Sequence, residues 1–148
     1  MDYRHLFRQM GIISRQAMMN MNHEASQYNL DNNLFLILIR IVEHEGLNQS
    51  QLSHMVKIDK TTLSRSVRKL EDKGFITKKV NSKNKKFKEL FPTTKALQIY
   101  DRLIGFETIY IQSVMKNLTS SELFQLEAIL NKISITYISC ICNFGIKK

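Results

Sequence analysis

The sequence predicts a mainly α-helical chain with one small β-hairpin near its middle. Apolar residues recur at helical spacing over most of the 148 residues. The chain has only five glycines and one proline, so few long loops are expected. Two short segments rich in β-branched and aromatic residues, "FITKKV" and "FKELF", lie close together and are typical of paired strands.

The N-terminal part of the chain predicts one long helix and one buried helix. Apolar residues from Leu6 to Met21 keep a helical spacing over more than four turns. Asp31 or Asn32 could cap the next helix, "LFLILIRIVEHEG". That helix is apolar on most sides, so we expect it to be buried centrally and to end at Gly46 as its C-cap.

Two short helices are predicted next. Asn48 and Gln51 have the spacing of a capping box for the helix "NQSQLSHMV". After a very short turn, Asp59 is the predicted N-cap of "IDKTTLSRSVRKLEDKG", which should stop at Gly74. The residues expected to face inward in this second helix are Leu63, Ser66, Val67 and Leu70.

The hairpin strands are joined by "NSKNKK", and Pro92 should end the second strand because it has no N–H to donate. A long helix is predicted from Thr93 or Thr94 to about Lys116. The last helix opens with the capping box "TSSE". Its later part, "ISITYISCICNF", is rich in β-branched residues, so a strand there is the alternative to a continuing helix.

Positive charge is concentrated in one part of the chain. The protein carries a net charge of +9, and between Asp59 and Lys88 eleven Lys or Arg residues face three acids, a local net of +8. Such a patch indicates a polyanionic partner. A membrane surface is also a polyanion, but lysines on a hairpin lack the amphipathic helix that membrane binding favours.

The second short helix and the hairpin have the chemistry of DNA recognition. Arg can pair with two acceptors of guanine, and Ser and Thr can bond base edges or phosphates. The candidate reading residues are Lys60, Thr61, Thr62, Ser64, Arg65 and Arg68. Six lysines on one hairpin repel one another unless phosphates face them; these are Lys78, Lys79, Lys83, Lys85, Lys86 and Lys88. Two helices, a tight turn and a hairpin together predict a winged helix-turn-helix, although a solvated basic face remains an alternative.

The stretch "LNQSQLSHMVKIDKTTLSRSVRKLEDKGFITKKVNSKNKKFKELFPTTKA" resembles the MarR (multiple antibiotic resistance regulator) family of bacterial transcription factors. The resemblance implies a winged helix-turn-helix over residues 31–92, between helices of residues 1–30 and 93–148 that form a dimerisation region. It implies sequence-specific binding of double-stranded DNA at a pseudo-palindromic operator, usually repression, and in many members release by a small, often phenolic, ligand.

One departure from the family lies at the tip of the wing. The family often has an Asp followed closely by an Arg that enters the minor groove, whereas this chain has Asn84, Lys85 and Lys86. Lysine keeps the charge but lacks the flat fork of arginine. We therefore expect weaker minor-groove discrimination, with phosphate attraction retained.

The terminal helices carry more apolar residues than one short domain could cover, which predicts a homodimer; a larger monomeric core is the alternative. In relatives an effector pocket lies between the dimer helices and the DNA-binding part. Four residues could line such a pocket here or simply belong to the core: Phe7, Met10, His44 and Tyr110.

Several other classes of function are not expected. The start "MDYRHLF" lacks a signal peptide, and the longest uncharged run, Ile133 to Ile146, is fourteen residues, so we expect a soluble cytoplasmic protein.

Cys140 and Cys142 would point about 200° apart on a helix; inert thiols are favoured over a bridge or redox role. The histidines lack ligand spacing and no catalytic motif occurs, so no metal, cofactor or enzyme activity is expected. The alternative function is a winged-helix module whose basic wing binds an acidic protein.

Overall fold

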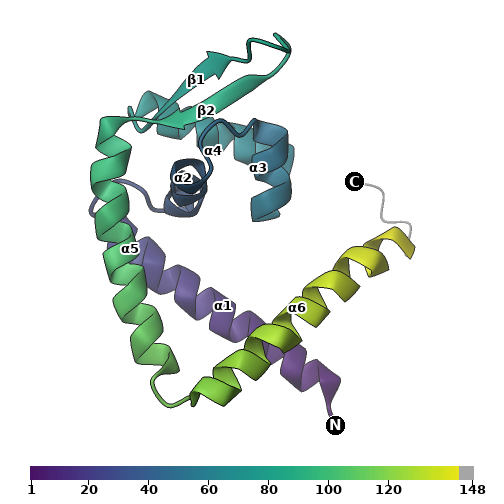
Figure 1. Cartoon of the computed structure of the whole chain (residues 1–148). Coiled ribbons are helices and arrows are strands. Elements are labelled where there is room, and N and C mark those ends of the chain that lie inside the picture. The colour runs from purple at the N-terminus through teal and green to yellow at the C-terminus, as the bar shows by residue number, and fades with distance from the viewer. Residues whose placement is uncertain (144–148) are drawn as a thin grey trace. The chain divides into compact units, whose positions relative to one another are not determined.

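The computed structural model describes the backbone of residues 1–143 and the side chains of residues 1–134. Figure 1 shows the helices and the hairpin in chain order. The chain divides into two compact units, Met1–Thr108 and Ile109–Lys148, which are described separately. In chain order the elements are α1 (Tyr3–Ser26), α2 (Leu34–Glu43), α3 (Gln49–Val56), α4 (Lys60–Asp72), β1 (Ile76–Val80), β2 (Lys88–Pro92), α5 (Thr94–Met115) and α6 (Ser120–Asn143). The prediction of a mainly helical chain with a two-stranded wing is confirmed.

The core of the first unit is built around α2. Six of its ten residues are buried, as expected for a helix that is apolar on most sides. Figure 1 shows α2 end-on, with α3, α4 and the hairpin around it. The core also takes Leu52 from α3, the inward residues of α4, and Ile76 and Leu90 from the hairpin. The elements that carry the basic residues are therefore fixed to one common core.

Both predicted ends of α2 differ from those observed. The N-cap is Asn33, in a left-handed conformation with φ 63°, and not Asp31 or Asn32. Asn22 on α1 accepts a hydrogen bond from the Asn33 backbone N–H at 2.8 Å and donates to its side chain at 2.7 Å. The helix ends at Glu43, with His44 as its C-cap, so the prediction of Gly46 is wrong by two positions.

The two short helices begin where the sequence predicts. Asn48 accepts a hydrogen bond from the Gln51 backbone at 2.9 Å, and the Gln51 side chain accepts one from Asn48 at 3.0 Å, which completes the capping box. Lys57, in a left-handed conformation, ends α3. Asp59 then caps α4. The two helices are thus joined by a tight turn, as in a helix-turn-helix.

The wing is a two-stranded antiparallel sheet in which Ile76 pairs with Pro92 and Val80 with Lys88. A third segment lies along β2: the Gly46 N–H donates to the Leu90 carbonyl, and the Leu90 N–H donates to the Leu47 carbonyl, both at 2.9 Å. The base of the wing is therefore bonded to the residues that lead into α3, and Gly46, with φ 87°, makes the turn that allows this.

The second unit contains the end of α5 and the whole of α6. Thr119 and Glu122 form the predicted capping box, with the Glu122 carboxylate accepting from the Thr119 backbone at 2.7 Å. The prediction that the last segment continues as a helix is confirmed through Asn143. Cys140 and Cys142 lie in this helix, but their side chains are outside the described ones, as are residues 144–148 altogether.

Candidate nucleic-acid interface

Helix α4 separates an apolar face from a polar, exposed face. Leu63, Val67 and Leu70 are fully buried, as predicted, whereas Ser66, which was also expected to face inward, is only half-buried and donates to the Thr62 carbonyl. Most of the opposite side is exposed, and it carries all six predicted reading residues: Lys60, Thr61, Thr62, Ser64, Arg65 and Arg68. Because the buried face fixes the rotation of the helix, these six side chains are held on the outside.

The N-terminus of α4 is stabilised by Asp59. Its carboxylate accepts a hydrogen bond from the Thr62 backbone N–H at 2.9 Å. Hydrogen bonds from the Thr62 side chain and backbone lower the pKa of Asp59 below its ordinary value of 3.8. The Thr62 backbone is therefore engaged in capping, whereas no hydrogen bond occupies the hydroxyls of Thr61 and Ser64 in the described part of the chain.

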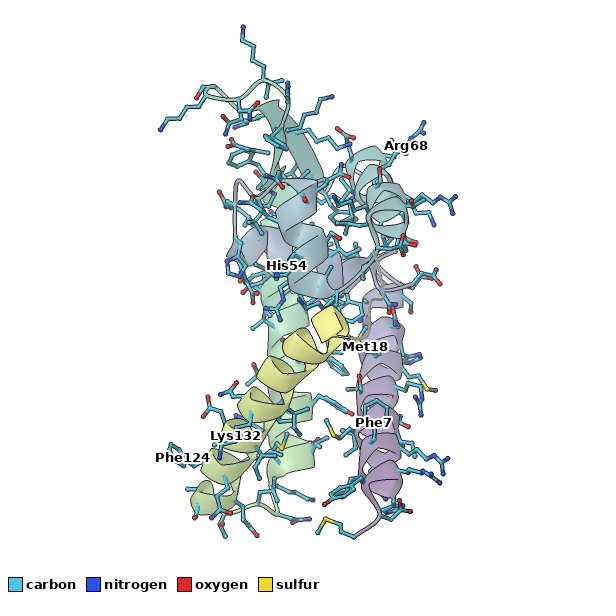
Figure 2. The ribbon with its side chains drawn as sticks, turned by 90° about the vertical axis from the view of Figure 1, so that its right-hand side faces the viewer. Phe7, Met18, His54, Arg68, Phe124 and Lys132 are labelled. Atoms are coloured by element: carbon cyan, nitrogen blue, oxygen red, sulfur yellow. The ribbon has the colours of Figure 1, made fainter. Side chains whose placement is uncertain are left out.

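The two arginines of α4 have no side-chain partner in the part of the chain that the structure describes. Within the described residues, neither Arg65 nor Arg68 makes an ion pair or a side-chain hydrogen bond, and both are exposed. Figure 2 shows the Arg68 side chain pointing away from the helix. Two unpaired guanidinium groups one turn apart on an exposed face can form bidentate hydrogen bonds with base edges or phosphates.

The six wing lysines fall into two groups. Lys78 forms an ion pair with Glu71 of α4 at 2.5 Å, and the Lys79 ammonium lies 4.7 Å from the centre of the Phe91 ring. The other four are exposed and have no ion pair among the described residues; they are Lys83, Lys85, Lys86 and Lys88. A count of charges along the sequence does not separate the two groups. The alternation of side chains along β1 does distinguish Lys78, because it places Lys78 on the same face of the strand as Ile76.

The wing tip is held by asparagine side chains. The Asn81 side-chain oxygen accepts from the backbone N–H groups of Lys83 and Asn84, each at 2.8 Å. The Asn84 side chain accepts from the Lys86 backbone at 3.2 Å. Such local bonds replace ladder hydrogen bonds at a turn. They leave the ammonium groups of the tip exposed.

A hollow of about 260 Å³ lies between the start of α3 and the second wing strand. Its lining residues are Asn48, Gln49, Ser50, Lys86, Phe87 and Lys88. Lysines beside the first N–H groups of a helix favour an anion at this place. Sequence reasoning missed this neighbourhood because the start of α3 and the wing are distant along the chain.

The four residues predicted to line an effector pocket are not gathered around either hollow. A hollow of about 590 Å³ is lined by residues of α1 and the α1–α2 loop, and it includes none of them. Phe7, Met10 and His44 are exposed in the first unit, and Tyr110 belongs to the second. The pocket therefore stays a prediction.

A hydrogen bond links the end of α2, next to His44, to α5. The Tyr100 hydroxyl donates to Glu43 at 3.5 Å, and Glu43 also pairs with Arg40 at 2.7 Å. Burial raises the pKa of Tyr100, and the nearby charge of Glu43 adds to this.

Neither a membrane-spanning helix nor a metal site occurs among the described residues. No helix in that part of the chain has both the length and the hydropathy that crossing a membrane requires. No three His, Cys, Asp or Glu side chains come together there as a metal site.

Comparison with known proteins identifies the family. Residues 30–88 match the model of the MarR family. Over 128 residues the chain is 34% identical to the HTH-type transcriptional regulator YybA of Bacillus subtilis (strain 168), and the match covers 86% of this chain and 85% of YybA. The chain belongs to the MarR family. It is thus a MarR-family transcriptional regulator, which agrees with the expectation that it is not an enzyme.

Solved structures of MarR-family proteins share the fold of this chain. A MarR family transcriptional regulator from Listeria monocytogenes, crystallised with a 26mer DNA, has a TM-score of 0.88 and 35% identity over 96% of both chains. A MarR protein from Peptoclostridium difficile has a TM-score of 0.86 and 30% identity, covering 93% of this chain and 89% of that one.

Proposed function

We propose that this MarR-family regulator binds double-stranded DNA sequence-specifically as a homodimer and represses transcription from a pseudo-palindromic operator. The observation that carries the proposal is the exposed face of α4, where Arg65 and Arg68 have no partner among the described residues. The Listeria relative bound to a 26mer DNA supports the choice of DNA as the partner. A repressor of bacterial transcription acts in the cytoplasm, where the DNA is.

The two parts of the interface have different roles in this proposal. Arg65, Arg68, Thr61 and Ser64 contact base edges in the major groove, where each base pair presents a distinct pattern of donors and acceptors. The four wing lysines that have no ion pair among the described residues contact phosphates, and the counterions they release drive binding regardless of sequence. Affinity and specificity should therefore be separable by mutation.

Exposed apolar side chains support dimerisation through the terminal helices. On α1, Tyr3 and Phe7 are 78% and 73% exposed, and in the second unit Phe124 is 74% exposed. Exposed apolar faces of this kind are usually covered by a partner. A two-fold dimer would place two copies of α4 on half-sites about one DNA turn, roughly 34 Å, apart.

Release of DNA by a small ligand is the regulatory part of the proposal. Phe7 and Met10 are 73% and 38% exposed, so they are not used in the core of the protomer and are available to a ligand or a partner. A panel of small phenolic compounds, tested for displacement of bound DNA, would examine this part separately.

The test of the main proposal is selection of bound sequences from a random duplex pool at near-physiological salt. Enrichment of a two-fold-symmetric site with half-sites one turn apart is expected. Retention of DNA without enrichment would contradict sequence-specific binding. No retention at all would favour the alternative, a winged-helix module whose basic wing binds an acidic protein. Sedimentation of the free protein should give the mass of a dimer.

A further inference from the structure

Lys78 differs from the other wing lysines in the direction that its side chain takes. Along β1, Ile76 and Lys78 share one face of the strand, because successive side chains alternate. That face turns toward the core: Ile76 is buried, and so is Leu90, the partner of Lys78 in the sheet. The Lys78 side chain is only 19% exposed and ends at the Glu71 carboxylate, 2.5 Å away.

The ion pair spans the turn between α4 and the wing. Glu71 lies in the last turn of α4, and Lys78 lies in the middle of β1. Between them the chain reverses at Gly74, whose φ of 75° places it in the left-handed region. A bond across this turn restrains the angle between the helix and the hairpin.

We propose that the Lys78–Glu71 ion pair is a brace, meaning that it fixes the orientation of the wing relative to α4. Lys78 is then a positioning residue for DNA recognition and does not contact a phosphate. This inference rests on the proposed function, because a set angle matters only if α4 and the wing engage one duplex together. It separates Lys78, which orients the hairpin, from the four exposed lysines that attract the phosphate backbone; Lys79, the sixth, lies over the Phe91 ring.

The brace itself is tested on the free protein by a double-mutant cycle. Urea unfolding is measured for the wild type, Lys78→Gln, Glu71→Gln and the double variant. The unfolding constants should show a coupling of roughly two- to fivefold, the range for a partly exposed ion pair. If the effects of the two substitutions on the free energy of unfolding were additive, Lys78 and Glu71 would not be coupled and the proposed brace would be refuted.

The role in DNA binding is tested by the dependence of affinity on salt, with Lys85→Gln as the matched control. Removing one lysine–phosphate interaction should lower the slope of log affinity against log salt by about 0.9. Lys85→Gln removes this interaction from both protomers of the dimer and should lower the slope by about 1.8, whereas Lys78→Gln should keep the wild-type slope and instead lower the ratio of operator to random-DNA affinity. Exchanging the charges, Glu71→Lys with Lys78→Glu, should recover that ratio relative to Lys78→Glu alone.

Two results would overturn the positioning role. The first is a decrease in slope for Lys78→Gln equal to that of Lys85→Gln, which would make Lys78 a phosphate contact. The second is an unchanged affinity ratio in both Lys78 variants. If the wild type bound no DNA, the proposed function would fail and the positioning role with it, whereas the unfolding cycle would still decide whether the brace exists.

Discussion

Replacing Arg65 by Ala should weaken operator binding without weakening the fold. Arg65 is exposed and has no partner among the described residues, so its removal leaves no group of the free protein unsatisfied. The free energy of unfolding should therefore change by no more than about 0.5 kcal/mol, as for other exposed positions.

The effect on the complex can be estimated from the hydrogen bonds that Arg65 would make to a base. One bidentate pair between an arginine and a guanine contributes about 1–3 kcal/mol of discrimination against other bases. At 25 °C this corresponds to a roughly 5- to 150-fold loss of operator affinity for each half-site, and the homodimer loses the contact at both half-sites. Binding to random DNA should fall much less, because only the charge of Arg65 contributes there.

Fluorescence anisotropy with the selected operator and with a random duplex measures both affinities. Arg102→Ala is the matched control, because Arg102 is also exposed and has no ion pair within the described residues, yet lies on α5. The control should leave the affinity ratio unchanged. If Arg65→Ala weakened operator and random DNA by the same factor, the assignment of Arg65 to base recognition would be refuted.

Four further predictions concern the wing and the fold. Lys83→Gln combined with Lys86→Gln removes two lysines from each protomer of the dimer, so it should flatten the salt slope by about 3.6 and leave the ratio of operator to random affinity unchanged; a changed ratio would contradict the phosphate role. Leu63→Ala should lower the free energy of unfolding in urea by about 2–5 kcal/mol, because the side chain is fully buried; a decrease below roughly 1 kcal/mol would show that the core can refill the space. Gly74→Ala should cost about 1–2 kcal/mol in thermal unfolding through its left-handed backbone alone, since a Cβ there meets nothing within 4 Å; no cost would mean that the turn adapts. The lowered pKa of Asp59 stabilises the fold above pH 3.8, and this contribution is lost as the pH falls through the folded pKa; Asp59→Asn should therefore lose less stability in acid, and equal pH profiles of the melting temperature would refute this.

Signals that are local in sequence predicted the structure well. The capping box of Asn48 and Gln51 and the cap at Asp59 depend on residues three positions apart, so the sequence shows both partners together. The buried side of α4 followed in the same way from the spacing of Leu63, Val67 and Leu70. These features fix which side of α4 is exposed, and hence most of the candidate interface.

Features that depend on distant partners could not be predicted in this way. Asn33 occupies the N-cap position of α2, where its backbone N–H and side chain are bonded to Asn22, eleven positions earlier on another helix. The pairing of Lys78 with Glu71 crosses from a strand to a helix. The one sequence signal for this pair was that Ile76 and Lys78 share a face of β1. A count of charges misses this signal because it treats every lysine alike.

The four wing lysines that have no ion pair among the described residues have a physiological consequence. If all four contact phosphates, affinity falls with salt concentration to the power of about 3.6 for each wing, so a doubling of ionic strength weakens the contribution of each wing about twelvefold. Lysine ammonium groups act as point charges and lack the bidentate hydrogen bonds that arginine makes to phosphate. Most of this attraction is therefore weakened by salt. Operator occupancy would then fall when a cell accumulates potassium under osmotic stress, even without any inducer.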